Sequence, residues 1–270
     1  MQAPAAPSPQ IRFDDGAAYE QFMGVWSRLA GERFLQWLGA PAGWRWADVG
    51  CGNGAFTALL LERCAAREIE GIDPSAEQLA FARTRFPANA PVRFVQGDAT
   101  ALPWAEDAFD AAAMALVIFF VPDPARGVAE MARVVRPGGS VSAYAWDILG
   151  GGFPYGVLQE EMAAIGSPPA WPPSVEASRL EAMRALWNGA GLLDVATHEI
   201  VVERTFADFD SYWAIARTGP RLASSIAAMP AEQHERFRAR VRERLGSDAD
   251  GRVTCRATAN AVRGRVPGAR

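Results

Sequence analysis

The chain has 270 residues, of which 50% are hydrophobic and 21% are charged. A chain of that length and composition can bury a sizeable core, which excludes a protein that is disordered throughout. It holds 27 basic residues, all of them arginine, against 31 acidic residues, and its formal net charge is −4. This balance disfavours binding driven by bulk positive charge, so we expect no nucleic-acid partner.

The three cysteines are Cys51, Cys64 and Cys255. An odd, small number in a chain of this length argues against a disulfide framework. The N-terminus lacks the basic segment and apolar run of a secretory signal. The longest apolar run, Ala111–Val121, is shorter than the ~20 residues that a membrane helix needs. We therefore expect a cytoplasmic protein with no membrane partner and no metal site.

The N-terminal part divides into a tail and a helix. Residues 1–16 are rich in proline and predict a flexible tail. From Tyr19 to Leu38, apolar residues recur at three- and four-residue spacings, which predicts a leading helix. With the turn after it, this helix forms a unit of residues 17–43 that could act as a lid.

Strands and helices then alternate through residues 44–147. The predicted strands are Trp44–Val49, Glu68–Asp73, Val92–Gly97, a stretch within Phe109–Phe120, and Ser140–Trp146. The predicted helices are Ala55–Ala66, one that follows Pro74 and ends at Phe86, and one from Pro124 to Val135 that stops sharply at Arg136–Gly139. This alternation is typical of a parallel sheet with helices on both faces.

The pattern weakens after residue 150. The predicted helices there are Val157–Ile165, Ser178–Ala190, Asp208–Arg217 and Ala231–Leu245, and the predicted strands are Val195–Phe206 and Arg252–Val262. We expect the two strands to complete the sheet and the helices to cap it, so residues 148–270 are not a separate second domain.

Three aspartates mark one edge of the predicted sheet. Asp48, Asp73 and Asp98 are 25 residues apart, and each falls at the carboxyl end of a predicted strand. Ligands of open α/β sheets bind in the crevice at that edge. The spacing predicts that three carboxylates converge on one crevice, although an aspartate in such a position can also merely start a turn.

The most informative segment runs from Asp48 to Gly54 and reads DVGCGNG. Glycines here permit positive φ and a close approach of a ligand to the backbone, and they expose N–H groups where a helix begins. A dinucleotide fingerprint has its third glycine one residue later. Asp48 would also repel a pyrophosphate, whereas it would favour a ligand that carries an ammonium group.

This segment resembles the first motif of class I S-adenosylmethionine-dependent methyltransferases, in the ubiquinone/menaquinone-biosynthesis branch (methyltransferase type 11). Further stretches match in order and spacing: Gly71–Ser75, Gln96–Trp104, Phe109-Asp110, Pro122–Pro124, Glu130–Gly139 and, in the leading helix, Tyr19–Arg28. The resemblance covers roughly residues 17–147. It implies a doubly wound, seven-stranded, mostly parallel Rossmann-like sheet with a helical cap, and S-adenosylmethionine as cofactor.

The resemblance also implies which residues hold the cofactor. The implied set is Tyr19, Arg28, Asp48, Gly50, Gly52, Asp73, Pro74, Gln78, Asp98, Ala99, Ala115 and Leu116. The glycine backbone would wrap the methionyl part beside Asp48, and Asp73 would accept hydrogen bonds from the ribose hydroxyls. Asp98 and the Ala99 N–H would hold the adenine, which Pro74 and Gln78 would border together with the ribose.

The remaining four lie around the other side of the implied cofactor. Ala115 and Leu116, after the fourth strand, would touch it there. Tyr19 and Arg28 would close over it, with Arg28 facing the carboxylate.

The acceptor side departs from the family, because relatives often carry histidine where this chain has Phe119-Phe120. Asp147 is then the carboxylate that could act as a base, and His198 and His234 are not expected to be catalytic. The implied pocket walls are Phe119, Phe120, Trp146, Phe153 and Tyr155. These aromatic side chains could equally be plain core.

The implied reaction is in-line methyl transfer to a small, partly hydrophobic acceptor. Because the leaving group is good, an acceptor that is already nucleophilic needs no base. Two other functions stay open: a protein that binds the cofactor without transferring methyl, and an NAD-dependent oxidoreductase, which the early third glycine and Asp48 disfavour. The acceptor and the oligomeric state are not predicted.

Charge is divided unevenly along the chain. Residues 201–270 hold 13 arginines against 8 acidic residues, whereas residues 1–200 hold 14 against 23. The arginine-rich end could cover the acceptor side and face an anionic partner. Alternatively, Arg236–Arg244, with arginine at every second position, is a solvated helix with internal ion pairs.

Overall fold

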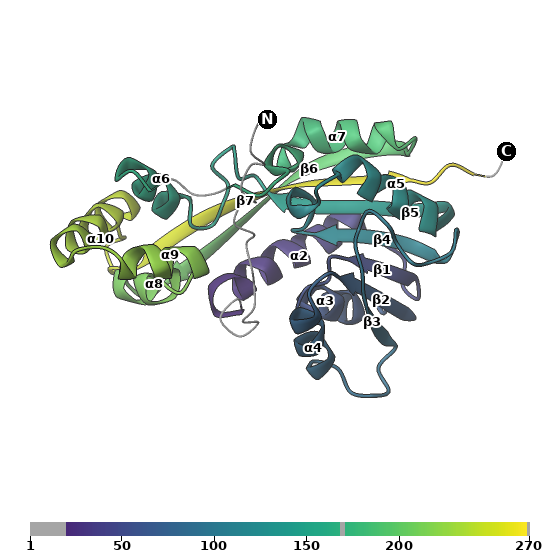
Figure 1. Ribbon diagram of the computed structural model, residues 1–270, viewed down its shortest axis with the longest axis horizontal. Coiled ribbons are helices and arrows are strands. Elements are labelled where there is room, and N and C mark those ends of the chain that lie inside the picture. The colour runs from purple at the N-terminus through teal and green to yellow at the C-terminus, as the bar shows by residue number, and fades with distance from the viewer. Residues whose placement is uncertain (1–19, 168–170, 269–270) are drawn as a thin grey trace, which may run out of the picture.

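The computed structural model describes residues 20–167 and 171–268. The predicted seven-stranded sheet is confirmed, with strand order β3-β2-β1-β4-β5-β7-β6 (Figure 1). Its strands are β1 (Arg45–Val49), β2 (Glu68–Asp73), β3 (Val92–Gln96), β4 (Phe109–Ala115), β5 (Val135–Trp146), β6 (Leu193–Phe206) and β7 (Val253–Arg265). The proposed tail and Tyr19 lie outside the described residues.

The first five strands are parallel, and the last two are antiparallel to their neighbours. β1 pairs with β2 on one side and with β4 on the other, so the strand order reverses between β1 and β4. In doubly wound sheets this switch point opens a crevice at the carboxyl ends of the strands. The sheet therefore positions a ligand site where the glycine turn follows β1.

Helices cover both faces of the sheet. Successive side chains of a strand point to opposite faces, and here the side chains on both faces are apolar. Ala111 and Ala113 of β4 belong to one buried cluster with α2 (Val25–Leu38) and α3 (Ala55–Cys64). Ala112 and Met114 belong to the other, with α5 (Pro124–Val134) and α7 (Leu180–Gly189). The fourth helix, α4 (Ala76–Thr84), packs on β2 and β3. In the described part of the chain, no helix has the length and apolarity to cross a bilayer.

One local prediction was wrong. The helix α5 ends at Val134, close to the predicted stop, but the fifth strand begins at Val135 and not at Ser140, so Arg136–Gly139 is part of β5. The pairing shifts from Phe109↔Val135 to Ala111↔Ser140, so the extra residues bulge within the strand. The fourth strand lies within Phe109–Phe120 as predicted; it ends at Ala115, and η2 (Ile118–Phe120) follows as a short 3-10 helix.

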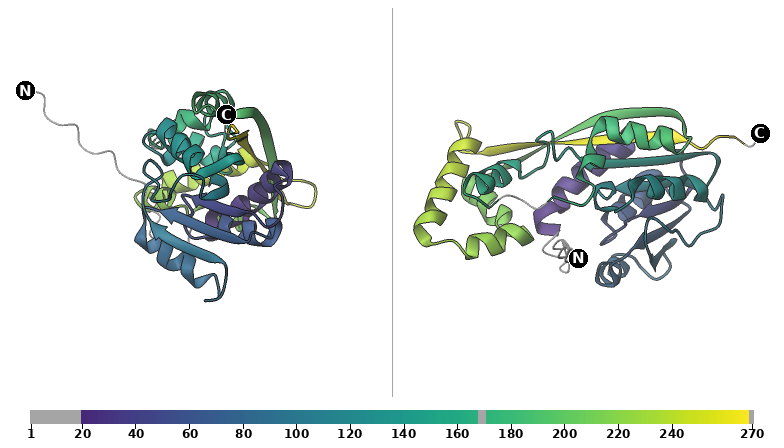
Figure 2. Two further views of the ribbon diagram at one scale, coloured as in Figure 1. Left: turned by 90° about the vertical axis from the view of Figure 1, so that its right-hand side faces the viewer. Right: turned by 45° about the horizontal axis from the view of Figure 1, so that its top comes forward.

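The last two strands project beyond the carboxyl edge as a ribbon (Figures 1 and 2). Trp146, the last residue of β5, pairs with Ala259, so residues 253–258 of β7 pair only with β6. Loop 147–152 lies along the open side of this ribbon, since the Asp147 N–H donates to the Thr258 carbonyl at 2.9 Å. The ribbon thereby carries the cap away from the sheet.

The cap consists of four helices around the projecting ribbon (Figure 1). They are α6 (Gly156–Ala164), α8 (Phe209–Ala216), α9 (Pro220–Ala227), which the sequence did not predict, and α10 (Ala231–Leu245). Glu161 of α6 joins α6 to α10, since its side chain is 4% exposed and forms ion pairs with Arg240 at 2.6 Å and Arg244 at 3.1 Å. Glu160 pairs with Arg244 on the exposed side.

The neighbouring glutamates give a matched test of this junction. Glu161→Ala should lower the free energy of unfolding by about 1.5–3 kcal/mol, because it removes the buried carboxylate whose two charge-assisted contacts join α6 to α10. Glu160→Ala should cost less than about 1 kcal/mol, the usual value of an exposed pair. Urea unfolding measures both, and equal losses would contradict the role given to Glu161.

Candidate functional site

The glycine turn after β1 adopts the backbone that its sequence predicts. Gly50, Gly52 and Gly54 have φ of 77°, 50° and 78°, in the left-handed region that favours glycine. A Cβ at Gly50 would lie 2.4 Å from Val117 Cγ1, so the turn packs tightly against the segment after β4. A Cβ at Gly52 would meet nothing within 4 Å, so its backbone faces open space. A ligand can therefore approach the main chain at Gly52.

Asp73, at the end of β2, fixes the position of this turn. Its Oδ2 accepts a hydrogen bond from the Gly52 N–H at 3.0 Å, and its Oδ1 accepts from the Ser75 N–H at 2.9 Å. Burial raises the pKa of Asp73, and these two N–H groups act in the opposite direction. Each carboxylate oxygen can accept a second hydrogen bond, so Asp73 can still bind ligand hydroxyls.

Asp48 is fully buried at the end of β1, and only half of its carboxylate is satisfied. Oδ2 accepts from the Thr57 hydroxyl at 2.6 Å, whereas Oδ1 has no hydrogen-bond partner among residues 20–167 and 171–268. Burial, together with the nearby charge of Asp73, raises the pKa of Asp48 to about 7. A cationic group placed beside Oδ1 would relieve this unfavourable burial.

Asp98 lies at the same edge, as the spacing predicts. The N–H of Gly97 donates to the Asp73 carbonyl at 3.2 Å, which joins the ends of β2 and β3. Asp98 is exposed, and its Oδ1 accepts from the Thr100 N–H and hydroxyl at 2.7 and 2.6 Å. The Pro74 carbonyl beside it accepts from Gln96 Nε2 at 2.9 Å. The three aspartates thus follow adjacent strands along one edge.

Three other members of the predicted set flank this edge. Gln78 is buried in the first turn of α4, and its N–H donates to the Ser75 hydroxyl at 3.2 Å, which caps the helix. Ala99 is half-buried and packs against the α5 side of the sheet. Ala115 is half-buried at the end of β4, and Leu116 follows it with φ of 62°, a strained value for a bulky side chain.

The leading helix meets the glycine turn through residues that the sequence analysis missed. It opens with η1 (Glu20–Gly24), and Glu20 Oε1 accepts from Asn53 Nδ2 at 2.9 Å. Glu20 also pairs with Arg85, whose Nε donates to the Asn53 carbonyl at 2.6 Å. Asn53 lies inside the glycine motif, which was the one signal in the sequence for this contact.

The prediction for Arg28 was wrong. Its guanidinium lies 2.9 Å from Glu62 and 3.2 Å from Glu32, and the side chain is 51% exposed. Glu62 comes eight residues after Gly54, or about 12 Å along α3. These two carboxylates hold Arg28 on the surface between α2 and α3. Arg85 is the arginine that lies beside the glycine turn.

The predicted acceptor walls do not form one surface. Trp146 and Tyr155 are 2% and 1% exposed in the cluster that contains α2, and Phe153 packs against that cluster. Phe119 and Phe120 lie on the other face of the sheet, because η2 turns toward the segment before α7 and the Phe119 carbonyl accepts from the Ser174 N–H at 3.0 Å. Trp146, Tyr155 and Phe119 are therefore core residues.

Asp147 and the two histidines take part in local structure. Asp147 Oδ1 accepts from the Gly150 N–H at 3.2 Å and so stabilises the turn after β5. His198 stacks on Trp37 with ring centroids 5.4 Å apart. His234 packs on Trp213 in the cap. None of these contacts positions a base beside the glycine turn.

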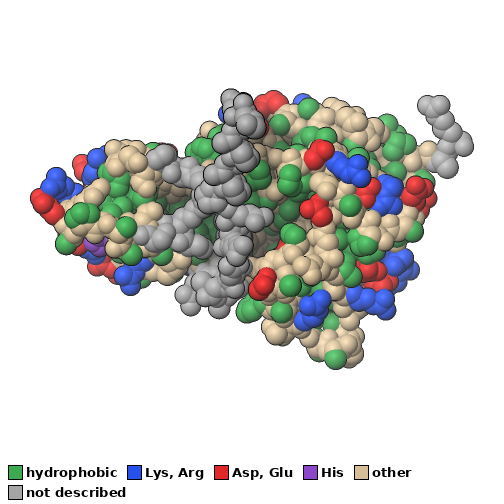
Figure 3. Space-filling view, in the orientation of Figure 1, with side chains coloured by type: hydrophobic (Ala, Val, Ile, Leu, Met, Phe, Trp, Pro, Cys, Tyr) green, Lys and Arg blue, Asp and Glu red, His purple; other side chains and the backbone are tan. Residues whose placement is uncertain are grey.

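The arginines of α10 are paired, as the second interpretation of the charge pattern expects. Arg238 and Arg242 both reach Asp210, at 2.6 and 2.8 Å. The other pairs are Arg236 with Glu232, Arg240 with Glu161, and Arg244 with Glu160 and Glu161. Charges of both signs accordingly mix at the cap end of the molecule (Figure 3). This helix is not a free anion site.

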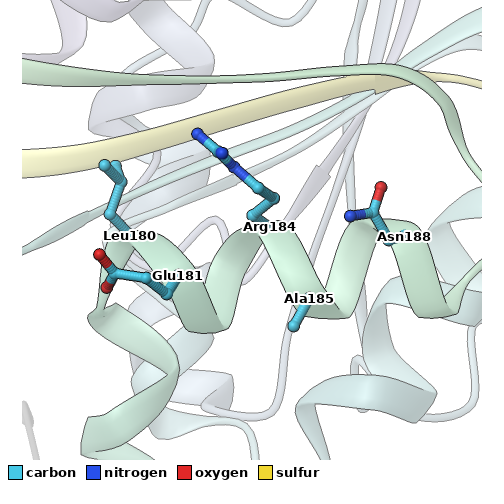
Figure 4. Close-up of a pocket in the computed structure, with 5 residues that line it drawn as sticks. All are labelled: Leu180, Glu181, Arg184, Ala185 and Asn188. Carbon is cyan, nitrogen blue, oxygen red and sulfur yellow. The ribbon is translucent and has the colours of Figure 1, made fainter.

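Two surface pockets lie on α7, away from the glycine turn. One, of about 250 Å³, is lined by Leu180, Glu181, Arg184, Ala185 and Asn188 (Figure 4). The other, of about 590 Å³, lies between α5 and α7. Because α7 packs on β6 and β7, the strands β4 and β5 separate the part of the sheet under this helix from β1. Neither pocket includes a residue of the predicted cofactor site.

Comparison with known proteins identifies the part of the chain that carries this edge. Residues 47–143 match the model of a family described as methyltransferase domain. Malonyl-[acyl-carrier protein] O-methyltransferase of Pectobacterium atrosepticum is 34% identical over 124 residues, which are 46% of this chain and 47% of that protein. Residues 47–143 are a methyltransferase domain.

Other relatives of similar identity are also named as methyltransferases. The 2-phytyl-1,4-beta-naphthoquinone methyltransferase of Arabidopsis thaliana is 36% identical over 44% of this chain and 46% of its own. Demethylmenaquinone methyltransferase of Bacillus licheniformis is 32% identical over a stretch that covers 41% of this chain and 48% of that protein. The chain thus spans about half the length of the curated relatives it matches.

Solved structures extend the likeness in fold beyond the methyltransferase domain. Phosphoethanolamine N-methyltransferase 2 of Haemonchus contortus has a TM-score of 0.60 at 18% identity, over 95% of this chain and 58% of that chain. YcgJ protein of Bacillus subtilis has a TM-score of 0.54 at 20% identity, over 93% of this chain and 100% of that chain. The Rossmann-like fold that the resemblance implied is therefore confirmed.

The buried carboxylate of Asp48 predicts a pH dependence of stability. Its pKa is about 7 in the folded chain and about 3.9 when unfolded, so the folded state holds its proton over that interval. The ligand-free protein should lose stability as pH rises from about 4 to 7, by roughly 2–4 kcal/mol from this group. Asp48→Asn should lack this loss. Thermal unfolding between pH 4.5 and 8 measures it, and parallel profiles of the two proteins would contradict the prediction.

Proposed function

We propose that the chain is an S-adenosylmethionine-dependent methyltransferase that acts on a small, partly hydrophobic acceptor. The observation that carries the proposal is the edge of the methyltransferase domain at β1 and β2. There an open glycine backbone, a hydroxyl-binding carboxylate and a half-satisfied buried carboxylate lie together. This combination fits a ligand that carries both an ammonium group and ribose hydroxyls.

The residues present fit this cofactor part by part. Asp48 Oδ1 lacks a partner among the described residues and suits the ammonium of the methionyl group. Asp73 retains acceptor capacity for the two ribose hydroxyls. Asp98, Ala99, Pro74 and Gln78 lie at the neighbouring strand end, where they would hold the adenine. Ala115 and Leu116 would border the cofactor from the β4 side.

The cofactor supplies an electrophilic methyl group and a neutral thioether leaving group, so its transfer requires no acid. The work of the chain is then to orient the two reactants, which is worth several kcal/mol in favourable cases. Glu20, held by Asn53 and Arg85, would keep the leading helix over the glycine turn. Asp147, His198 and His234 are all engaged in local contacts elsewhere, which favours an acceptor that is nucleophilic by itself, such as an enolate or phenolate.

The names of the relatives support the proposed reaction. Two are naphthoquinone or menaquinone methyltransferases, and one is an O-methyltransferase of a malonyl-carrier protein. Because the chain spans about half of each, their acceptors are not transferred to it. What these proteins share is methyl transfer, and the proposal takes over that reaction alone.

Cofactor binding is tested with S-adenosylhomocysteine, the demethylated product, and with NAD in separate calorimetric titrations. The wild-type protein should bind S-adenosylhomocysteine well below millimolar concentration and more tightly than NAD. Asp73→Ala should weaken that binding by about 1.5–3 kcal/mol, the range for hydrogen bonds that involve a charged group. Asp250→Ala, the same substitution in an exposed cap turn, serves as the control and should bind as the wild type does.

The outcomes separate the alternatives. Tighter binding of NAD, or no binding of S-adenosylhomocysteine below millimolar concentration, would overturn the proposal. An unchanged affinity of Asp73→Ala would remove that residue from the site. Release of S-adenosylhomocysteine from the methyl donor, screened over phenols, quinol precursors, amines and thiols, distinguishes transfer from binding alone.

A further inference from the structure

One arginine lies on the buried face of the projecting ribbon. Arg204 of β6 pairs with Cys255 of β7, and both point to the side that buries Val202 and Phe206. The guanidinium stacks on the Phe206 ring, with Cζ 4.5 Å from the centroid. Its Nη1 is buried and has no hydrogen-bond partner in the described part of the chain.

This environment contrasts with that of the arginines on α10, each of which has a carboxylate partner. Within residues 20–167 and 171–268, no carboxylate lies at ion-pair distance from Arg204. The Arg204 side chain as a whole is half-buried, but its buried Nη1 has lost contact with water without gaining a protein acceptor, which is costly. The arrangement therefore leaves a place for an anion on this side of the ribbon.

The Tyr212 ring packs against the same Phe206 side chain on which Arg204 stacks. Tyr212 of α8 is fully buried, and its hydroxyl has no partner among the described residues. Its ring meets Phe206 edge-on with centroids 5.2 Å apart and lies 6.0 Å from the Tyr155 ring. Two independent donors, the Arg204 Nη1 and the Tyr212 hydroxyl, are thus unsatisfied around one aromatic ring.

The cluster supplies a single positive charge. Burial raises the pKa of Tyr155 to about 12 and that of Cys255 to about 11, against the opposing influence of the Arg204 charge, so both groups stay neutral near pH 7. Burial also raises the pKa of Tyr212. A ligand that carries one negative charge would balance Arg204, whereas a phosphate dianion would leave a charge unpaired. A carboxylate also matches the planar guanidinium fork.

The cluster lies beyond the carboxyl edge, in the direction from which an acceptor would meet the methyl group. Ala259 pairs with Trp146 at the end of β5, and Cys255 is four residues further out, or roughly 13 Å along the strand. Here α8 contacts both β6 of the ribbon and η1, the start of the leading helix. An acceptor whose carboxylate lies at Arg204 would have to extend over at least that distance to reach the end of β5.

We propose that Arg204 and Tyr212 bind a carboxylate of the methyl acceptor, which is therefore a small organic acid with an apolar body. This inference rests on the proposed methyl transfer for its link to the acceptor. The aromatic neighbours Phe206 and Tyr155 would pack against the apolar body. The carboxylate would then set which end of the molecule faces the methyl group.

The test uses the full chain with benzoate, phenylacetate and cinnamate, each compared with its neutral amide. Ligand-observed NMR gives the affinities, with and without saturating S-adenosylhomocysteine. At least one acid should bind about tenfold or more tightly than its amide, since a hydrogen bond to a charged group has that effect. Arg204→Gln and Tyr212→Phe should each remove most of the preference.

Arg256→Gln provides the matched control, because Arg256 is exposed on the opposite side of the same ribbon. It should keep the preference for the acid. Affinity for S-adenosylhomocysteine, measured in every variant, reports that the sheet is folded and tests the proposed cofactor separately. If no acid is preferred over its amide, or if Arg204→Gln binds as the wild type does, the proposal is wrong, whatever the cofactor result.

Discussion

The arrangement of the site depends on one buried carboxylate that has too few partners. Asp48 ends β1 beneath the glycine turn, with Thr57 on one oxygen and no described partner on the other. Evolution of a stable core alone would favour an apolar residue there, since a half-satisfied buried carboxylate is costly. The glycine turn above it and Asp73 beside it make sense together as one receptor for a cationic, hydroxyl-bearing ligand.

The projecting ribbon carries the cap helices and Arg204 beyond the end of the parallel sheet. β5 ends where the parallel sheet ends, whereas β6 and β7 continue and carry α8 and α10 outward. Ion pairs at Glu161 join the cap helices, while Arg204 inside the ribbon stays without a carboxylate in the described chain. In the two proposals, the glycine turn would receive a cationic group and the ribbon an anionic one, and this division would orient the two reactants toward each other.

The sequence was sufficient to predict those elements and site residues whose position depends on a short-range pattern. Alternating elements, and aspartates and glycines at strand ends, follow from local propensity and spacing, so β1, β2 and their turn were predicted closely. Arg28 was misplaced because its direction depends on Glu62, 34 positions away. Phe119 was misplaced because η2 decides which face of the sheet it joins. Glu20, Arg85 and Arg204 owe their roles to distant partners, which no local pattern reveals.

The most direct measurement is the number of protons released when S-adenosylhomocysteine binds. Calorimetry in buffers of different ionisation enthalpy, at pH 6.5–7, measures it. Because Asp48 titrates at about pH 7 when free and would be held ionised by the ligand ammonium, the wild-type protein should release about half a proton or more. Asp48→Asn should release much less. Binding without proton release, or equal release by both proteins, would contradict the account.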